Sequence, residues 1–82
     1  MLSASEVRWL LDALCIELGF CLPPADVERL MGQPPSDVEE FTDAVFAAEG
    51  LDPTTADRRL YRHVKAMVAK AFQESSQRAP TQ

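Results

Sequence analysis

Glycine and proline divide this sequence into four segments, and each segment repeats its apolar residues at helical spacing. The chain has three glycines, Gly19, Gly32 and Gly50, and a proline follows each within four residues. Glycine just after a helix and proline shortly beyond it are typical stop signals. No segment shows the period-two alternation of a half-buried strand. The sequence therefore predicts an all-α fold, a compact bundle of four helices over residues 4–18, 24–31, 37–49 and 53–75.

Each predicted helix begins at a residue type that suits a helix N-terminus. The first and third helices follow a serine that has a glutamate three residues later, the pattern of a capping box. The second and fourth begin with a proline, whose missing N–H costs nothing in the first turn. In chain order, the expected start signals are Ser3 with Glu6, Pro24, Ser36 with Glu39, and Asp52 with Pro53.

The length of the chain, 82 residues, suits one domain. We expect this domain to cover residues 1–75, followed by a polar, flexible tail over residues 76–82. No apolar run approaches the roughly 18 residues that a membrane span requires. The N-terminus also lacks the basic start of a secretion signal. The expected location is therefore the cytoplasm, without membrane contact.

Two cysteines, Cys15 and Cys21, flank the stop after the first predicted helix. Zinc sites usually pair cysteines across about two to four intervening residues and need two further ligands. Here five residues intervene, and the only histidine is His63. Two cysteines without a secretion signal do not suggest a disulfide framework, whereas a free cysteine packs as a small hydrophobe. We therefore expect two structural thiols, with no metal and no cofactor.

No group of residues in the sequence has the pattern of a catalytic site. His63 has no nucleophile or carboxylate placed against it by the sequence pattern, so we expect no catalytic residue and no enzyme activity. Acyl carrier proteins look similar in outline, because they too are acidic four-helix domains of about this size. Their attachment serine stands between Asp and Leu, whereas Ser36 stands between Pro35 and Asp37. An acyl-carrier-like protein is therefore a remote alternative.

The first predicted helix carries a second apolar face opposite its core stripe. At about 100° per residue, Leu11, Leu14 and Leu18 mark the core side of this helix. Either the helix is buried on two sides within the bundle, or the second face is an exposed patch for a partner. A tryptophan in such a patch is typical of interface hot spots. The residues of this candidate apolar patch are Trp9, Ala13, Ile16 and Phe20.

Charge is divided unevenly along the chain, whose net charge is −5. Residues 1–57 contain twelve acidic and two basic residues, whereas residues 58–82 contain six basic and one acidic residue. The basic side chains could be a solvated face neutralised by neighbouring acids, or could bind an acidic protein or nucleic acid. Nucleic acid is the least favoured of these, because the chain is acidic overall and has no recognisable reading motif. The candidate basic face consists of Arg58, Arg59, Arg62, Lys65 and Lys70.

These patterns favour a small non-enzymatic protein-interaction module, such as an adaptor, a regulator or an inhibitor-like protein. Its partner would be another protein or a second copy of the chain in a two-fold homodimer. A nucleic-acid-binding regulator that uses the candidate basic face is the alternative interpretation.

Overall fold

The computed structural model describes residues 2–78, except for the side chains of residues 76–78. Within that range it contains four helices and no strand, which confirms the predicted all-α bundle. The helices are α1 (Ala4–Leu18), α2 (Pro24–Gly32), α3 (Val38–Ala48) and α4 (Arg58–Arg78). The predicted tail began at residue 76, but residues 76–78 belong to the last turn of α4. Residues 79–82 lie outside the described part of the chain.

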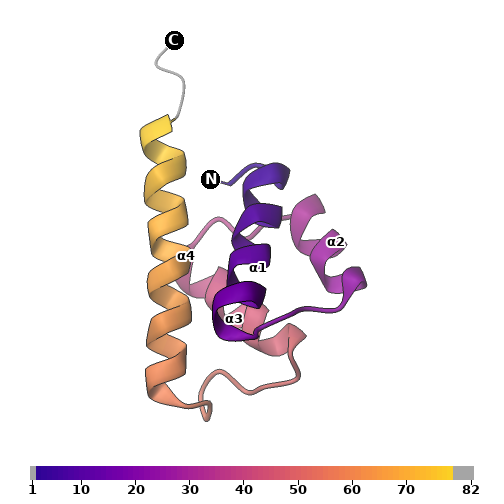
Figure 1. Cartoon of the computed structure of the whole chain (residues 1–82), viewed down its shortest axis with the longest axis vertical. Helices are drawn as coiled ribbons and strands as arrows, with labels where there is room; N and C mark the ends of the chain where they lie inside the picture. Colours follow the sequence, from indigo (N-terminus) through magenta and orange to yellow (C-terminus); the bar gives the residue numbers. More distant parts are fainter. Residues whose placement is uncertain (1, 79–82) are drawn as a thin grey trace.

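The longest helix, α4, forms one side of the bundle (Figure 1). It packs against α1 and α3, while α2 packs against the other side of α1. The chain directions of α1 and α4 are opposed, so the N-terminal half of α1 lies beside the C-terminal half of α4 (Figure 1). A hydrogen bond from the Ser75 hydroxyl to Glu6 Oε1, at 3.1 Å, joins these two ends.

One hydrophobic core connects the helices. Three aromatic rings cross it in sequence, with centroid distances of 5.0 Å between Phe20 and Phe46 and 5.3 Å between Phe46 and Tyr61. Tilted aromatic pairs at such distances add to the stabilisation from burial. The buried apolar residues of the helices are Val7, Leu10, Leu11 and Leu14 of α1, Leu30 of α2, Phe41, Val45 and Phe46 of α3, and Val64, Val68 and Ala71 of α4.

The helix starts agree with the sequence at α1 and α2 and differ at α3. Ser3 Oγ accepts from the Glu6 N–H at 3.2 Å and Glu6 Oε1 accepts from the Ser3 N–H at 2.8 Å, which confirms the capping box. Pro24 is the first residue of α2, as expected. At α3 the expected cap Ser36 is wrong, because Asp37 Oδ2 accepts from the N–H groups of residues 39 and 40. A carboxylate beside these amides caps well and also interacts favourably with the helix dipole.

The start of α4 lies five residues beyond the predicted one, at Arg58 instead of Pro53. Asp52 does accept from the backbone and side chain of Thr54, at 2.9 and 2.7 Å, but it closes a separate turn. Asp57 is the residue that caps α4, because its Oδ1 accepts from the N–H groups of residues 59 and 60 at 2.8 and 3.3 Å. Aspartate stabilises turns as readily as helix starts, so Asp52 before a proline did not by itself mark the start of the helix.

The helix ends use glycine at two of the three predicted places. Gly19 and Gly50 have φ angles of 69° and 77°, the left-handed conformation that a residue with Cβ adopts at a cost. Gly32 differs from the prediction, since it is the last residue of α2 and does not have a positive φ.

The expectation of two free thiols is wrong. Cys15 and Cys21 form a disulfide, with their Cα atoms 4.3 Å apart. The left-handed turn at Gly19 sends the chain back along α1, and the Phe20 N–H donates to the Leu14 carbonyl at 3.2 Å. This reversal brings Cys21 beside the last turn of α1, which the number of intervening residues alone did not reveal.

Candidate functional site

Trp9 lies on the outside of the molecule. Its side chain is 65% exposed and that of Ile16 is 82% exposed, so α1 is not buried on two sides. Among the described residues, Leu51 is the one other exposed large hydrophobic, at 41%. Ala13, between Trp9 and Ile16 on the same face, is half-buried. The interpretation that buries this helix on two sides is therefore wrong, and binding of a partner to the exposed face stays a prediction.

Phe20 does not belong to the exposed part of the candidate apolar patch. It is 5% exposed and packs on Phe46, because the turn at Gly19 ends α1 before Phe20 can continue its outer face. The sequence extrapolated the helix through this residue, whereas the chain turns inward there. The exposed patch is therefore reduced to Trp9 and Ile16, with Ala13 between them.

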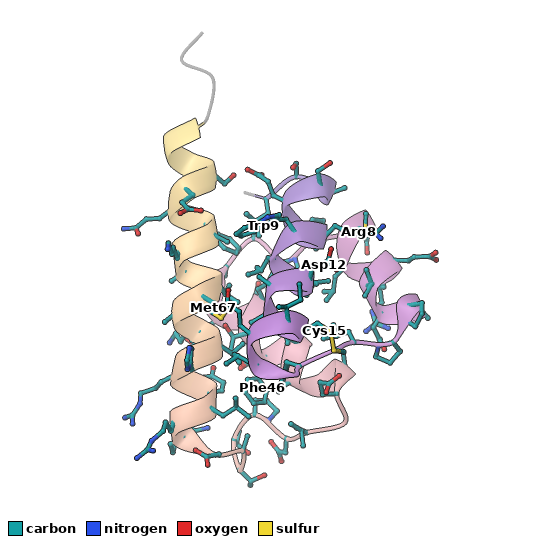
Figure 2. All side chains as sticks on the ribbon, viewed as in Figure 1. Arg8, Trp9, Asp12, Cys15, Phe46 and Met67 are labelled. Atoms are coloured by element: carbon teal, nitrogen blue, oxygen red, sulfur yellow. A yellow bond between two sulfur atoms is a disulfide. The ribbon has the colours of Figure 1, made fainter. Side chains whose placement is uncertain are left out.

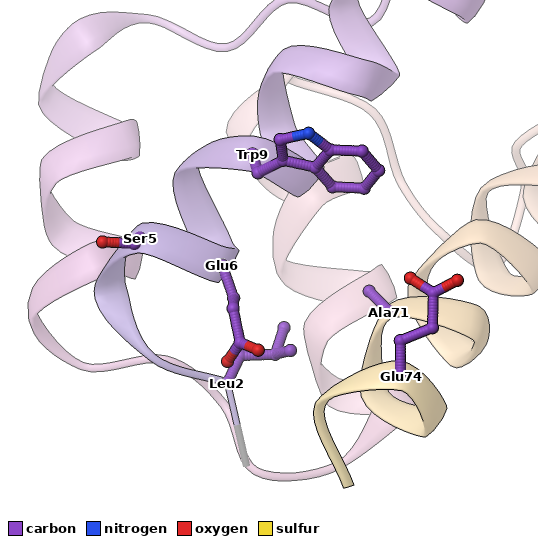
Figure 3. Close-up of a pocket in the computed structure, with 6 residues that line it drawn as sticks. All are labelled: Leu2, Ser5, Glu6, Trp9, Ala71 and Glu74. Carbon is purple, nitrogen blue, oxygen red and sulfur yellow. The ribbon is translucent and has the colours of Figure 1, made fainter. Parts of the chain in front are cut away.

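Two hollows flank Trp9 along the seam between α1 and α4, and together we name them the α1–α4 groove. The larger, of about 380 Å³, is lined by Leu2, Ser5, Glu6, Trp9, Ala71 and Glu74 (Figure 3). The smaller, of about 140 Å³, is lined by Trp9, Leu10, Ala13, Glu17, Met67, Lys70, Ala71 and Glu74. The two hollows adjoin each other, because both are lined by Trp9, Ala71 and Glu74. Trp9 and Met67 lie where α1 faces α4, and Cys15 lies on the other side of α1 (Figure 2).

The α1–α4 groove combines an apolar floor with a predominantly acidic rim. Glu6 already has a structural task, since its Oε1 accepts from the Ser3 N–H and from the Ser75 hydroxyl. In Figure 3 the Glu74 side chain reaches from α4 toward the side of the pocket where Trp9 lies, whereas Glu6 turns toward Leu2. Glu17, on α1, is the third carboxylate of the lining, and Lys70 is the one cation in it.

The candidate basic face is divided by the structure. Arg58 and Lys65 line a hollow of about 400 Å³ between α3 and α4 that also contains Glu39 and Asp43. The two outer arginines of the face, Arg59 and Arg62, are exposed, and Lys70 lines the α1–α4 groove. Acidic residues of α3 thus lie beside part of the face, as the interpretation of a neutralised surface expects. Binding of this face to an acidic protein or to nucleic acid stays a prediction.

A contact between α3 and α4 that the sequence did not indicate lies at the same place. The Tyr61 hydroxyl donates to Asp43 Oδ1 at 2.8 Å, and the Arg58 guanidinium lies 4.8 Å from the centre of the Tyr61 ring. Burial, and after it the hydrogen bond to the Asp43 carboxylate, together raise the pKa of Tyr61 to about 12. This contact depends on the register between α3 and α4, which the periodicity of a single helix does not give.

Two residues were considered for a catalytic or carrier role, and among the described residues neither has a catalytic partner beside it. His63 and Ser36 are both exposed, on α4 and in the α2–α3 connection. Within residues 2–78, no three His, Cys, Asp or Glu side chains are grouped as metal ligands would be. Nor does any helix in that part of the chain have both the length and the apolar character to cross a bilayer.

Comparisons of the chain with known protein families, with curated proteins and with solved structures found no match. The geometry of the α1–α4 groove is therefore the basis on which a function can be assigned.

Proposed function

We propose that this protein is a small non-enzymatic protein-interaction module, an adaptor, regulator or inhibitor-like protein, that binds its partner through the α1–α4 groove. The observation that carries the proposal is the exposure of Trp9 beside a hollow of about 380 Å³. Tryptophan and a neighbouring pocket are the typical centre of a protein interface.

Covering the exposed ring of Trp9 would stabilise a complex in proportion to the apolar area removed from water. A tryptophan side chain buries about 150–250 Å² when it is covered completely. With 65% of Trp9 exposed, a partner that covers it gains on the order of 3 kcal/mol from apolar burial. The adjoining Ile16, 82% exposed, extends the same surface along α1. Both side chains lie outside the core, so selection for folding does not explain them.

The test is capture of a partner by the tagged chain in the cells that produce it. Wild type is compared with Trp9→Ala and with Leu51→Ala, a matched control that removes an exposed apolar side chain away from the α1–α4 groove. We expect a discrete partner that is retained by Leu51→Ala and lost with Trp9→Ala. The same set of proteins bound by all three chains would contradict the proposal.

The location of the protein in the cell is part of the proposal and needs its own measurement. The cytoplasm was expected from the sequence, but disulfides persist mainly in oxidising compartments. The Cys15–Cys21 disulfide thus argues against a permanently reducing environment. Alkylation of free thiols in intact cells, followed by the mass of the chain, distinguishes the two: two alkyl groups support the cytoplasm, and none supports an oxidising compartment.

A further inference from the structure

The α1–α4 groove also indicates the chemistry of its partner. Resting on the proposed function, we infer that the groove accepts a basic amphipathic helix of another protein. The apolar side chains of this helix lie on Trp9 and Ala13, and its lysines or arginines lie beside Glu17 and Glu74.

The charge of the rim determines whether a partner with positive or negative charge is favoured. Three carboxylates, Glu6, Glu17 and Glu74, and one cation, Lys70, line the two hollows. Since Glu6 is held by Ser3 and Ser75, the carboxylates at Glu17 and Glu74 are the ones left to meet a partner. They come from opposite walls, one from α1 and one from α4, so a cation between the walls is attracted from both sides.

Trp9 also favours a partner with cationic side chains. Lysine and arginine side chains interact favourably with the face of an indole ring, and more so when a carboxylate lies nearby. Glu74 and Trp9 line both hollows together, which gives a cation an aromatic face and an anion at one place. An acidic segment would meet two carboxylates, Glu17 and Glu74, with Lys70 as the one compensating cation, and the phosphates of nucleic acid would be disfavoured in the same way.

The shape of the groove favours a helix over an extended strand. Along α1 its lining residues run from Ser5 to Glu17, which at 1.5 Å per residue spans about 18 Å, or roughly three turns of a helix. An extended peptide binds best by adding to the edge of a sheet, and residues 2–78 contain no strand. A helix that presents one apolar stripe fits a groove between two helices.

A second copy of this chain is a poor occupant. A two-fold dimer across the groove would place the acidic rim of one copy against the acidic rim of the other, and juxtaposed like charges disfavour association. Docking of the exposed arginines Arg59 and Arg62 into the groove of another copy would be head-to-tail, and such contacts tend to form open chains. The partner is therefore a different protein.

The experiment uses the whole chain and two synthetic amphipathic peptides of about 14 residues, one of leucine and lysine and one of leucine and glutamate. Trp9 is the only tryptophan, so its emission reports the site directly. We expect the lysine peptide to shift this emission to shorter wavelength and to perturb amide resonances along α1 and the C-terminal half of α4. The glutamate peptide should do neither.

Charge reversal separates the groove from the overall acidity of the chain. The double variant Glu17→Lys with Glu74→Lys should weaken binding of the lysine peptide about tenfold or more. The matched control, Glu28→Lys with Glu40→Lys, makes the same change of net charge at exposed positions on α2 and α3 and should change affinity less than about twofold.

Three results would overturn the inference: equal binding of the two peptides, equal weakening by the two double variants, or perturbations that map to α2 or α3. Its failure can be told from failure of the proposed function. If a partner captured in cells is lost with Trp9→Ala but retained after charge reversal of Glu17 and Glu74, the protein is an interaction module whose partner is not cationic. If capture does not depend on Trp9, both proposals fail.

Discussion

Helix α4 packs against two neighbours in two different ways. Its seam with α3 is closed in the core by aromatic rings, with Phe41 and Phe72 at a centroid distance of 6.1 Å and Phe46 and Tyr61 at 5.3 Å. The hollow of about 400 Å³ on that seam is lined mainly by polar and charged residues and has no exposed aromatic ring beside it. A hydrogen bond from the Tyr61 hydroxyl to Asp43 joins the two helices at the edge of this seam. Its seam with α1 is left open, with two hollows and an exposed tryptophan.

The difference separates the aromatic residues that are buried in the fold from the one that is exposed. Phe41 and Phe46 are completely buried, so their burial contributes to the stability of the fold. Trp9 has the largest side chain of any residue type and contributes little of its area to the core, although the α1–α4 seam is beside it. Folding should therefore depend on the α3–α4 seam, and binding on the α1–α4 groove.

The largest effect that tests this contrast is expected for Phe46→Ala. Phe46 is fully buried and contacts the rings of Phe20 and Tyr61, so the variant loses its burial and leaves a cavity. We expect a loss of about 3–5 kcal/mol in the free energy of unfolding, measured by urea denaturation followed by circular dichroism.

A loss of that size is comparable with the whole stability of a small domain. Phe46→Leu keeps most of the side-chain volume and should cost about 1.5 kcal/mol, which remains measurable in a folded protein. If neither variant were less stable than wild type, the α3–α4 seam would not be the stabilising part of the fold.

The disulfide is expected to have the second-largest effect. It closes a short loop, with six residues of sequence separation between Cys15 and Cys21, so the chain-entropy argument gives about 2 kcal/mol. The double variant Cys15→Ser with Cys21→Ser should lose about that amount, and a reducing agent should have no further effect on it. Because the bond lies on the side of α1 away from the groove, Trp9 emission should not change (Figure 2). Two titratable thiols in the purified wild-type protein would contradict this prediction.

The sequence predicted the elements of the fold because each depends on local chemistry. Helical spacing of apolar residues located the four helices, and the Ser3–Glu6 capping box and the left-handed glycines Gly19 and Gly50 were confirmed. The errors arose where two residues of the same connecting segment could each cap the helix that follows. Asp37 caps α3 in place of Ser36, and Asp57 caps α4 in place of Asp52.

The candidate site depends on how the helices face one another, and this is not a local property. Periodicity gives the direction of a side chain on its own helix but not the neighbour it meets, so Trp9 could have been inside or outside. The hollows beside Trp9 need Ala71 and Glu74, more than sixty residues away in the sequence. The disulfide and the inward turn of Phe20 likewise follow from the path of the chain after Gly19.

A smaller effect is expected at the edge of the closed seam. Tyr61→Phe removes the hydrogen bond to Asp43 and should cost about 1 kcal/mol at neutral pH. Tyr61 is the only tyrosine, so the ultraviolet absorbance of phenolate follows it alone, and we expect a pKa of about 12 in the folded protein against 10 when unfolded. Asp43→Asn should lower this pKa.

The sign of the pH dependence follows from the raised pKa. The folded state holds the phenol proton more tightly than the unfolded state does, so the contribution of Tyr61 to stability is complete below pH 10 and is lost as the pH rises toward 12. This decline should be absent in Tyr61→Phe. A folded-state pKa near 10 would show that Tyr61 and Asp43 do not interact in solution.

The smallest effect on stability is expected for the residue with the greatest proposed effect on binding. Trp9→Ala should change the free energy of unfolding by no more than about 0.5 kcal/mol, since the side chain is 65% exposed. The wild-type protein should have the long-wavelength emission of a tryptophan in water, and light scattering should give the mass of one chain. Short-wavelength emission with the mass of two chains would mean that a second copy covers Trp9, and the α1–α4 groove would then be a self-interface. A monomer destabilised by several kcal/mol in Trp9→Ala would instead place Trp9 in the core, and the contrast between the open and the closed seam of α4 would no longer hold.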